Sequence, residues 1–236
     1  VFLSGGQTGS LTLPHGSQVL TASGAAGAAL VSVREGHGIS LHLIRDSEAP
    51  QTIARLNTHL DAVAPPGTTS ISYTLTDPEG VLTARQVEAC LTLPPDYQPG
   101  RRYPVVIEVY PVGIGGGCQT FLDVPRPSPD VKDLWASLGA IHVRPPLPLD
   151  FARTADGPMA GTPALLDQTA EVLTDLGYAD PGRIALYGFS QGALPALYTA
   201  ARSDHFAAVI AMNGWADLLS HYFGGRGIAA TFHLGA

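Results

Sequence analysis

From residue 103 to residue 212 the sequence alternates strand-like runs with helical segments, and this alternation restricts the folds open to the chain. The strand-like runs are short, apolar and rich in β-branched residues, as in strands that are covered on both faces. The helical segments lie between them, and two of them end at glycine. Such an order predicts a parallel sheet with helices on both faces. The predicted strands are 103–110, 140–144, 183–187 and 207–212, and the predicted helices are 133–140, 163–176 and 191–202.

The part of the chain before residue 60 has a different pattern, with short strands separated by Gly-rich or acidic turns. Four antiparallel strands at this spacing are what one blade of a β-propeller needs, and a plain antiparallel sheet would have the same pattern. No second copy of the pattern follows. A joint rich in Pro, Gly and Thr, residues 62–70, separates this part from two further extended segments, 70–77 and 83–94. The four short strands are predicted at 17–23, 28–35, 39–46 and 51–56.

Residues 188–192 read GFSQG, a G-x-S-x-G pattern that occurs once and lies between a predicted buried strand and a predicted helix. In a nucleophile elbow the serine sits at a strained turn, usually with positive φ, so that its Oγ projects above the sheet. The flanking positions must be small because the strand and helix backbones nearly touch, and Gly188, Gly192 and Ala193 meet that need. The N–H groups at the start of the helix also favour developing negative charge. This context favours Ser190 as a nucleophile over a serine that only turns a corner.

The run YADPGRIALYGFSQGALPALY (178–198), preceded by LPPDYQPGRRYPVVIEVYP (93–111), resembles the prolyl oligopeptidase family of serine peptidases. The resemblance extends over most of residues 50–225. It implies a β-propeller followed by an α/β-hydrolase domain. We therefore expect residues 1–61 to be the last blade of a propeller, and residues 62–236 to be the N-terminal portion of an α/β-hydrolase domain that continues further.

The resemblance also implies an oxyanion role for Tyr110, which follows the first central strand in the sequence EVYPVG. A hydroxyl donor at this place, together with the backbone N–H of Gln191, would stabilise a tetrahedral intermediate by about 3–4 kcal/mol per donor. Periodicity alone would make Tyr110 a core aromatic residue at a strand end. The family often has an aromatic residue after the serine and a second glycine, whereas this chain has Gln191 and Ala193. Alanine is small enough to keep the close packing, but this departure puts the substrate contacts made by that aromatic residue in question.

Two aromatic residues in NGWADLLSHYFGG, Trp215 and Tyr222, occupy the segment that borders the primary specificity pocket in the family. Their size would suit an apolar or proline-like side chain of the substrate. The alternative is that both pack within a loop.

A serine needs a base, and the base needs an orienting acid. In α/β-hydrolases these follow the serine in the order acid, then histidine. The family places them after two further strands, which this sequence lacks, so we expect the triad Asp and His beyond residue 236 and little turnover from residues 1–236 alone. The Asp and His residues that do follow Ser190 are interpreted as loop or surface residues: Asp204, His205, Asp217, His221 and His233.

Other classes of function are disfavoured by charge and motif content. A net charge of −7 argues against nucleic acid or an anionic membrane surface as a partner. No run of about 18 apolar residues is present. The histidines lack metal-ligand spacing, and residues 113–118 (GIGGGC) fail as a dinucleotide loop, so we expect neither a metal nor a cofactor. Cys90 and Cys118 lack metal or redox spacing and are expected to be unpaired thiols, which leaves the compartment open between cytoplasmic and periplasmic or secreted. The oligomeric state is also open.

Three functions are compatible with these features. The leading hypothesis is a serine peptidase that cleaves peptide bonds through Ser190 and an acyl-enzyme intermediate, with a peptide or small acyl compound as substrate. An esterase or other acyl hydrolase of the same fold is the first alternative, because the elbow does not distinguish amides from esters. A binding protein that retains the fold without catalysis is the second.

Overall fold

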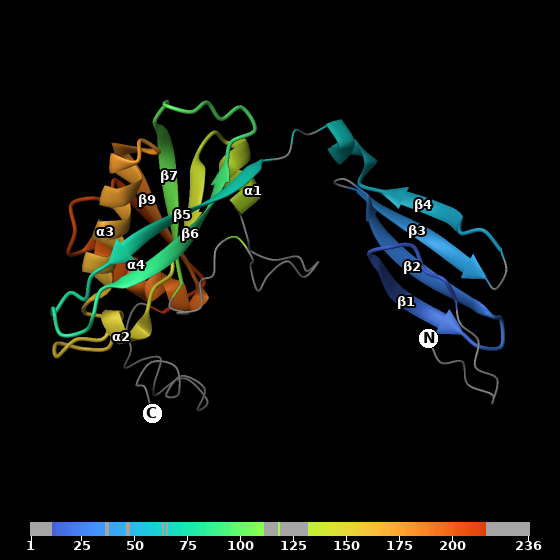
Figure 1. Ribbon diagram of the computed structural model, residues 1–236, viewed down its shortest axis with the longest axis horizontal. Helices are drawn as coiled ribbons and strands as arrows, with labels where there is room; N and C mark the ends of the chain where they lie inside the picture. The colour runs from blue at the N-terminus through green and yellow to red at the C-terminus, as the bar shows by residue number, and fades with distance from the viewer. Residues whose placement is uncertain are drawn as a thin grey trace. The chain divides into compact units, whose positions relative to one another are not determined.

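The computed structural model describes residues 11–35, 38–45, 48–62, 64, 66–110, 118 and 132–215. The chain forms two compact units, Val1–Pro65 and Pro66–Ala236, each with its own β-sheet (Figure 1). The assignment of the first unit to a β-propeller and of residues 62–236 to a hydrolase domain stays a prediction.

The first unit is a four-stranded antiparallel sheet in the order β1-β2-β3-β4. Its buried side chains alternate along β2, where Ala29, Val31 and Val33 lie on one face, and Ile44 of β3 joins them. This is the period of two that a half-buried strand requires. All four strands form where the sequence predicts them: β1 (Ser17–Ser23), β2 (Ala28–Glu35), β3 (Gly38–Arg45) and β4 (Gln51–Leu56), followed by the 3₁₀ helix η1 (Thr58–Ala62).

The second unit has a six-stranded sheet in the order β10-β9-β7-β8-β6-β5. The four strands predicted from the alternation, β7 to β10, run parallel to one another. The two extended segments before them pair antiparallel at the other edge and make the sheet mixed. The strands are β5 (Gly67–Leu75), β6 (Arg85–Leu93), β7 (Tyr103–Val109), β8 (Ile141–Arg144), β9 (Ala179–Phe189) and β10 (Ala208–Met212).

Helices cover both faces of this sheet, as the alternation predicts (Figure 1). Val105, Ile107 and Val109 of β7 face the main core, which α3 and α4 cover. Val106 faces the opposite side, where Trp135 of α1 packs. The helical elements of this unit are α1 (Lys132–Ser137), α2 (Leu149–Ala152), α3 (Thr162–Asp175), η2 (Ser190–Gly192) and α4 (Ala193–Ala200).

The cysteines contradict the sequence prediction. Cys90 of β6 and Cys118 form a disulfide, with their Cα atoms 4.6 Å apart, and are not free thiols. The prediction was wrong because a pair separated by 28 residues has no motif of its own. Only the sheet places β6 where residue 118 can reach it, and Cα atoms at this separation permit the bond.

A buried hydrogen bond joins β5 to α3 in the core of this unit. The Thr169 hydroxyl donates to the Leu165 carbonyl (2.9 Å), so its hydrogen is used and the Tyr73 hydroxyl must donate to Thr169 Oγ1 (3.0 Å). Removing the Thr169 hydroxyl therefore leaves the buried Tyr73 O–H without an acceptor. Removing the Tyr73 hydroxyl leaves the Thr169 O–H still bonded to the Leu165 carbonyl. We expect Thr169→Val to lower the free energy of unfolding by about 2 kcal/mol and Tyr73→Phe by about 1 kcal/mol. Urea unfolding of the full-length protein measures both.

The pH dependence of the same pair provides the control. Burial raises the pKa of Tyr73 to about 12. The unfolded phenol ionises near pH 10, so this contribution to stability is complete below pH 10 and is lost as the pH rises toward 12. Tyr73→Phe should lose less stability than the wild type over this interval. Equal losses would contradict the raised pKa of the buried phenol. A larger cost for Tyr73→Phe than for Thr169→Val at neutral pH would contradict the donor assignment.

Candidate active site

Ser190 occupies a strained turn between β9 and the helical segment that follows. Its φ is 54°, in the left-handed region that non-glycine residues rarely adopt. The preceding residue, Phe189, is still extended, and the next turn is the short 3₁₀ helix η2, which leads into α4. The positive φ that the elbow motif predicts is therefore present, and Ser190 remains partly exposed. Strain of this kind persists where the surrounding structure holds it.

Two glycines hold the turn by close backbone packing. A Cβ at Gly188 would overlap the Gly192 carbonyl oxygen, and a Cβ at Gly192 would overlap the Val109 carbonyl oxygen. The first contact packs the end of β9 against the residues that follow Ser190. The second presses the elbow against the end of β7, so that the start of α4 and the carboxyl end of β7 are in direct backbone contact.

Tyr110 emerges beside this elbow. It follows Val109, the last residue of β7, and Val109 is the register partner of Gly188 on β9. The Tyr110 ring lies against the elbow, with its Cδ2 atom 3.5 Å from the position that a Cβ of Gly192 would take. Tyr110 and Ser190 thus leave adjacent parallel strands at the same edge of the sheet. Both are partly exposed.

The strand connections reverse direction at this edge of the sheet. From β7 the chain passes to β8 with α1 on one face, and from β9 it passes to β10 with α4 on the other face. The connections leave β7 and β9 in opposite directions. In open α/β sheets, ligands bind at the carboxyl ends of the strands where this reversal occurs. Ser190 and Tyr110 stand on either side of that point.

The remaining predicted site residues have different positions. Gln191 is the first residue after Ser190 and lies in η2, where the first turn of a helix leaves backbone N–H groups unpaired by the helix. Trp215 is partly buried and follows Gly214, whose Cα packs against the Ser190 carbonyl and Ala193. Tyr222 lies outside the described residues.

The acid and base candidates after Ser190 do not reach it in the described part of the chain. Asp204 and His205 are exposed in the connection between α4 and β10, at the amino end of β10. Since β9 and β10 are parallel, this end is opposite to Ser190. Instead, His205 Nε2 lies 3.9 Å from Glu171 Oε1 of α3. The other three candidates, Asp217, His221 and His233, are outside the described residues.

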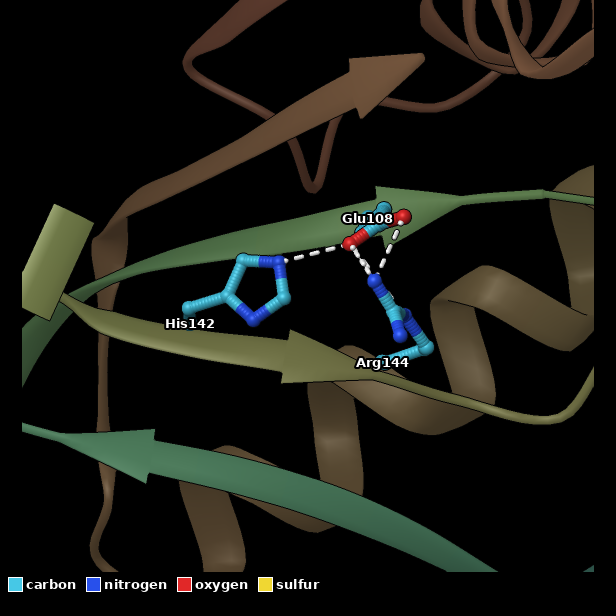
Figure 2. A network of polar contacts seen from close by, with 3 residues as sticks. All are labelled: Glu108, His142 and Arg144. Atoms are coloured by element: carbon cyan, nitrogen blue, oxygen red, sulfur yellow. Dashed lines mark hydrogen bonds and ion pairs between the residues drawn. The ribbon is translucent and has the colours of Figure 1, made fainter. Parts of the chain in front are cut away.

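A buried ionic cluster lies on the same sheet as the elbow, and sequence reasoning missed it (Figure 2). Glu108 of β7 accepts hydrogen bonds from His142 Nε2 (2.9 Å) and from the Arg144 guanidinium (2.8 and 3.0 Å to its two oxygens). The His142 side chain is 2% exposed and that of Glu108 is 12% exposed. The signal was present: polar residues stand in otherwise apolar strands, and His142 and Arg144 are two apart on β8, which puts them on one face.

Electrostatics favour the ionised carboxylate in this cluster. Burial alone would raise the pKa of Glu108, but the His142 hydrogen bond and the Arg144 charge outweigh it, and the pKa is lowered. Because a carboxylate only accepts, the hydrogen of the bond must reside on His142 Nε2.

His142 is not placed to serve as a base for Ser190. It is the register partner of Val106, which in turn pairs with Ala185, five residues before Ser190. At about 3.3 Å per residue, the backbone of His142 is therefore roughly 16 Å from that of Ser190 along the strand direction, toward the amino ends of the strands. The cluster therefore lies below the site and does not form part of a triad.

Among the described residues, no group of three or more His, Cys, Asp or Glu side chains could hold a metal ion. None of the described helices is both long and apolar enough to cross a membrane.

Residues 166–226, which include the elbow, match the sequence model of the prolyl oligopeptidase family. The resemblance predicted from the sequence is confirmed over this segment. No curated protein sequence matches the chain.

Several solved structures share the fold. A post-proline cleaving enzyme from Rickettsia typhi is 15% identical with a TM-score of 0.56, and the match covers 96% of this chain and 33% of that one. Prolyl oligopeptidase B from Galerina marginata is 16% identical with a TM-score of 0.54, covering 92% and 31%. An acylaminoacyl peptidase in complex with Z-Gly-Gly-Phe-chloromethyl ketone is 19% identical with a TM-score of 0.54, covering 93% and 34%. These enzymes combine a β-propeller with an α/β-hydrolase domain, and the chain has part of that fold while spanning about one third of their length.

Proposed function

We propose that this chain, whose residues 166–226 match the prolyl oligopeptidase family, is the part of a serine peptidase that presents the nucleophile and the oxyanion donors. One observation supports this above all others. Ser190 has φ 54° at the carboxyl end of β9, on an elbow packed against the strand end from which Tyr110 emerges. A serine that only turned a corner would not need this strained and closely packed geometry at the reversal point of the sheet.

The proposed reaction begins with attack of Ser190 Oγ on the carbonyl carbon of a peptide bond. The carbonyl oxygen becomes an oxyanion, which accepts hydrogen bonds from the Tyr110 hydroxyl and the Gln191 backbone N–H. The serine proton passes to a histidine oriented by an aspartate and then to the leaving amine, which yields the acyl-enzyme. Water hydrolyses the acyl-enzyme by the same route. We propose that this Asp and His follow residue 236 in the full-length protein, and that residues 1–236 alone have little activity.

The substrate is proposed to be a peptide. The acylaminoacyl peptidase of the same fold was solved with a peptidyl chloromethyl ketone, which supports a peptide ligand for this site. Trp215 follows the glycine that packs on the Ser190 carbonyl, so its segment borders the nucleophile. We propose that Trp215 and Tyr222 line a pocket for an apolar or proline-like side chain.

The test uses the full-length protein with a fluorophosphonate probe and two sets of reporters, peptide amides and short acyl esters. We expect the probe to modify one residue, Ser190, identified by mass spectrometry of the labelled peptide. Turnover of the amides would support the peptidase. Turnover of the esters alone would favour an acyl hydrolase, and absence of both labelling and turnover would favour a binding protein that retains the fold.

A further inference from the structure

We propose that Glu108 is a positioning residue for Tyr110, held by His142 and Arg144 so that the end of β7 directs the phenol toward the oxyanion. This inference rests on the proposed function of Ser190 and Tyr110. Glu108 would not contact the substrate and would act only through the strand to which it belongs.

The last residues of β7 are paired with fewer neighbouring strands than the residues before them. On the β8 side, the register pairs of β7 end at Ile107 with Val143. On the β9 side they end at Val109 with Gly188. Tyr110 follows both ends and has no register partner in the ladders described. Among the described residues, the hydrogen bonds between Glu108 and Arg144 therefore join β7 to β8 beyond the last register pair of these two strands.

Strand geometry transmits the position of Glu108 to Tyr110. The two residues are separated only by Val109, and residues two apart on a strand point to the same face. Val109 itself presses its carbonyl oxygen against the position of Gly192 in the elbow. A rotation of the strand at Glu108 would thus move the Tyr110 ring relative to the elbow that presents Ser190.

The chemistry of the cluster is better explained by a role in orienting Glu108 than by a contribution to the stability of the fold. Two nitrogens of Arg144 bind the Glu108 carboxylate, Nη2 at Oε1 (3.0 Å) and Nε at Oε2 (3.2 Å). His142 Nε2 also donates to Oε2, so the carboxylate is fixed in plane and in rotation (Figure 2). Apolar residues of similar volume often stabilise a fold as well as a buried ion pair does. A charged cluster below the site is therefore best explained by the geometry that it imposes on the strand end.

The test is a double-mutant cycle in the full-length protein, with a peptide amide reporter. We expect E108Q to lower kcat by about tenfold with KM changed by less than about twofold, and Y110F to lower kcat by about 10² to 10³. Because Glu108 acts through Tyr110, the double variant should lie within about twofold of Y110F alone. Thr169→Val is the matched control, since it disturbs a buried polar pair in the main core and should leave kcat within about twofold in either background.

Several outcomes would overturn the inference. One is an unchanged kcat in E108Q, and another is the same fractional loss with and without the Tyr110 hydroxyl. If E108Q does not fold, R144K replaces it in the same cycle, because lysine retains the charge but cannot fork to both oxygens. Full activity in Ser190→Ala would overturn the proposed function and this inference with it. Loss of activity in Ser190→Ala combined with an additive cycle would overturn the role of Glu108 alone.

Discussion

Replacing Ser190 with alanine should lower kcat/KM of the full-length protein for a peptide amide by about 10⁴ to 10⁶. The reason is that, in the proposed reaction, the hydroxyl at the elbow forms the bond to the substrate carbon, and no described side chain is placed to substitute for it. The proposed oxyanion donors remain, so some acceleration over water should survive. Steady-state kinetics and fluorophosphonate labelling measure the loss, and labelling should disappear altogether.

The control for this variant is Ser137→Ala, which removes a serine on the exposed surface of α1. It should leave both kcat/KM and labelling unchanged. Retention of more than about a tenth of the activity in Ser190→Ala, or continued labelling at another residue, would contradict the assignment of the nucleophile.

Gly192→Ala should destabilise the second unit by about 3 kcal/mol or more. The φ of Gly192 is −77°, which alanine adopts readily, so the cost arises from space and not from backbone conformation. The added Cβ would overlap the Val109 carbonyl oxygen, and backbone lies on both sides of the contact. The elbow must therefore move away from β7. We expect a lower midpoint of urea unfolding and, in the fraction that folds, slower labelling of Ser190.

Gly182→Ala is the matched control for this substitution. A Cβ at Gly182 would have only Asp180 Oδ1 nearby, at 3.9 Å, which is an ordinary contact. Its effect on stability should remain within about 0.5 kcal/mol. Equal effects of the two substitutions would show that the elbow is not packed against the end of β7.

Much of the local structure could be predicted from the sequence. The strands β1 to β4 form within a residue of their predicted bounds, because Gly-rich turns and a period of two are both local signals. The strained turn at Ser190 was predicted for the same reason, since small residues on both sides of the serine are visible in five consecutive positions. The positive φ confirms that prediction.

Contacts between distant segments could not be predicted in this way. The disulfide joins residues 28 positions apart, and its prediction was wrong. The antiparallel pair at the edge, β5 and β6, made the sheet mixed where only a parallel arrangement was predicted. The cluster around Glu108 was missed because His142 and Arg144 lie more than 30 residues further along the chain.

By itself, the sequence determined which segments become strands or helices and where the chain must turn sharply, because φ/ψ preference and apolar period act over a few neighbouring residues. The tertiary structure alone decided which strands lie side by side, since that depends on burying apolar faces from the whole unit at once. The adjacency of β7 and β9 is the consequence that matters for function, because it brings Tyr110 and the Ser190 elbow to one edge of the sheet.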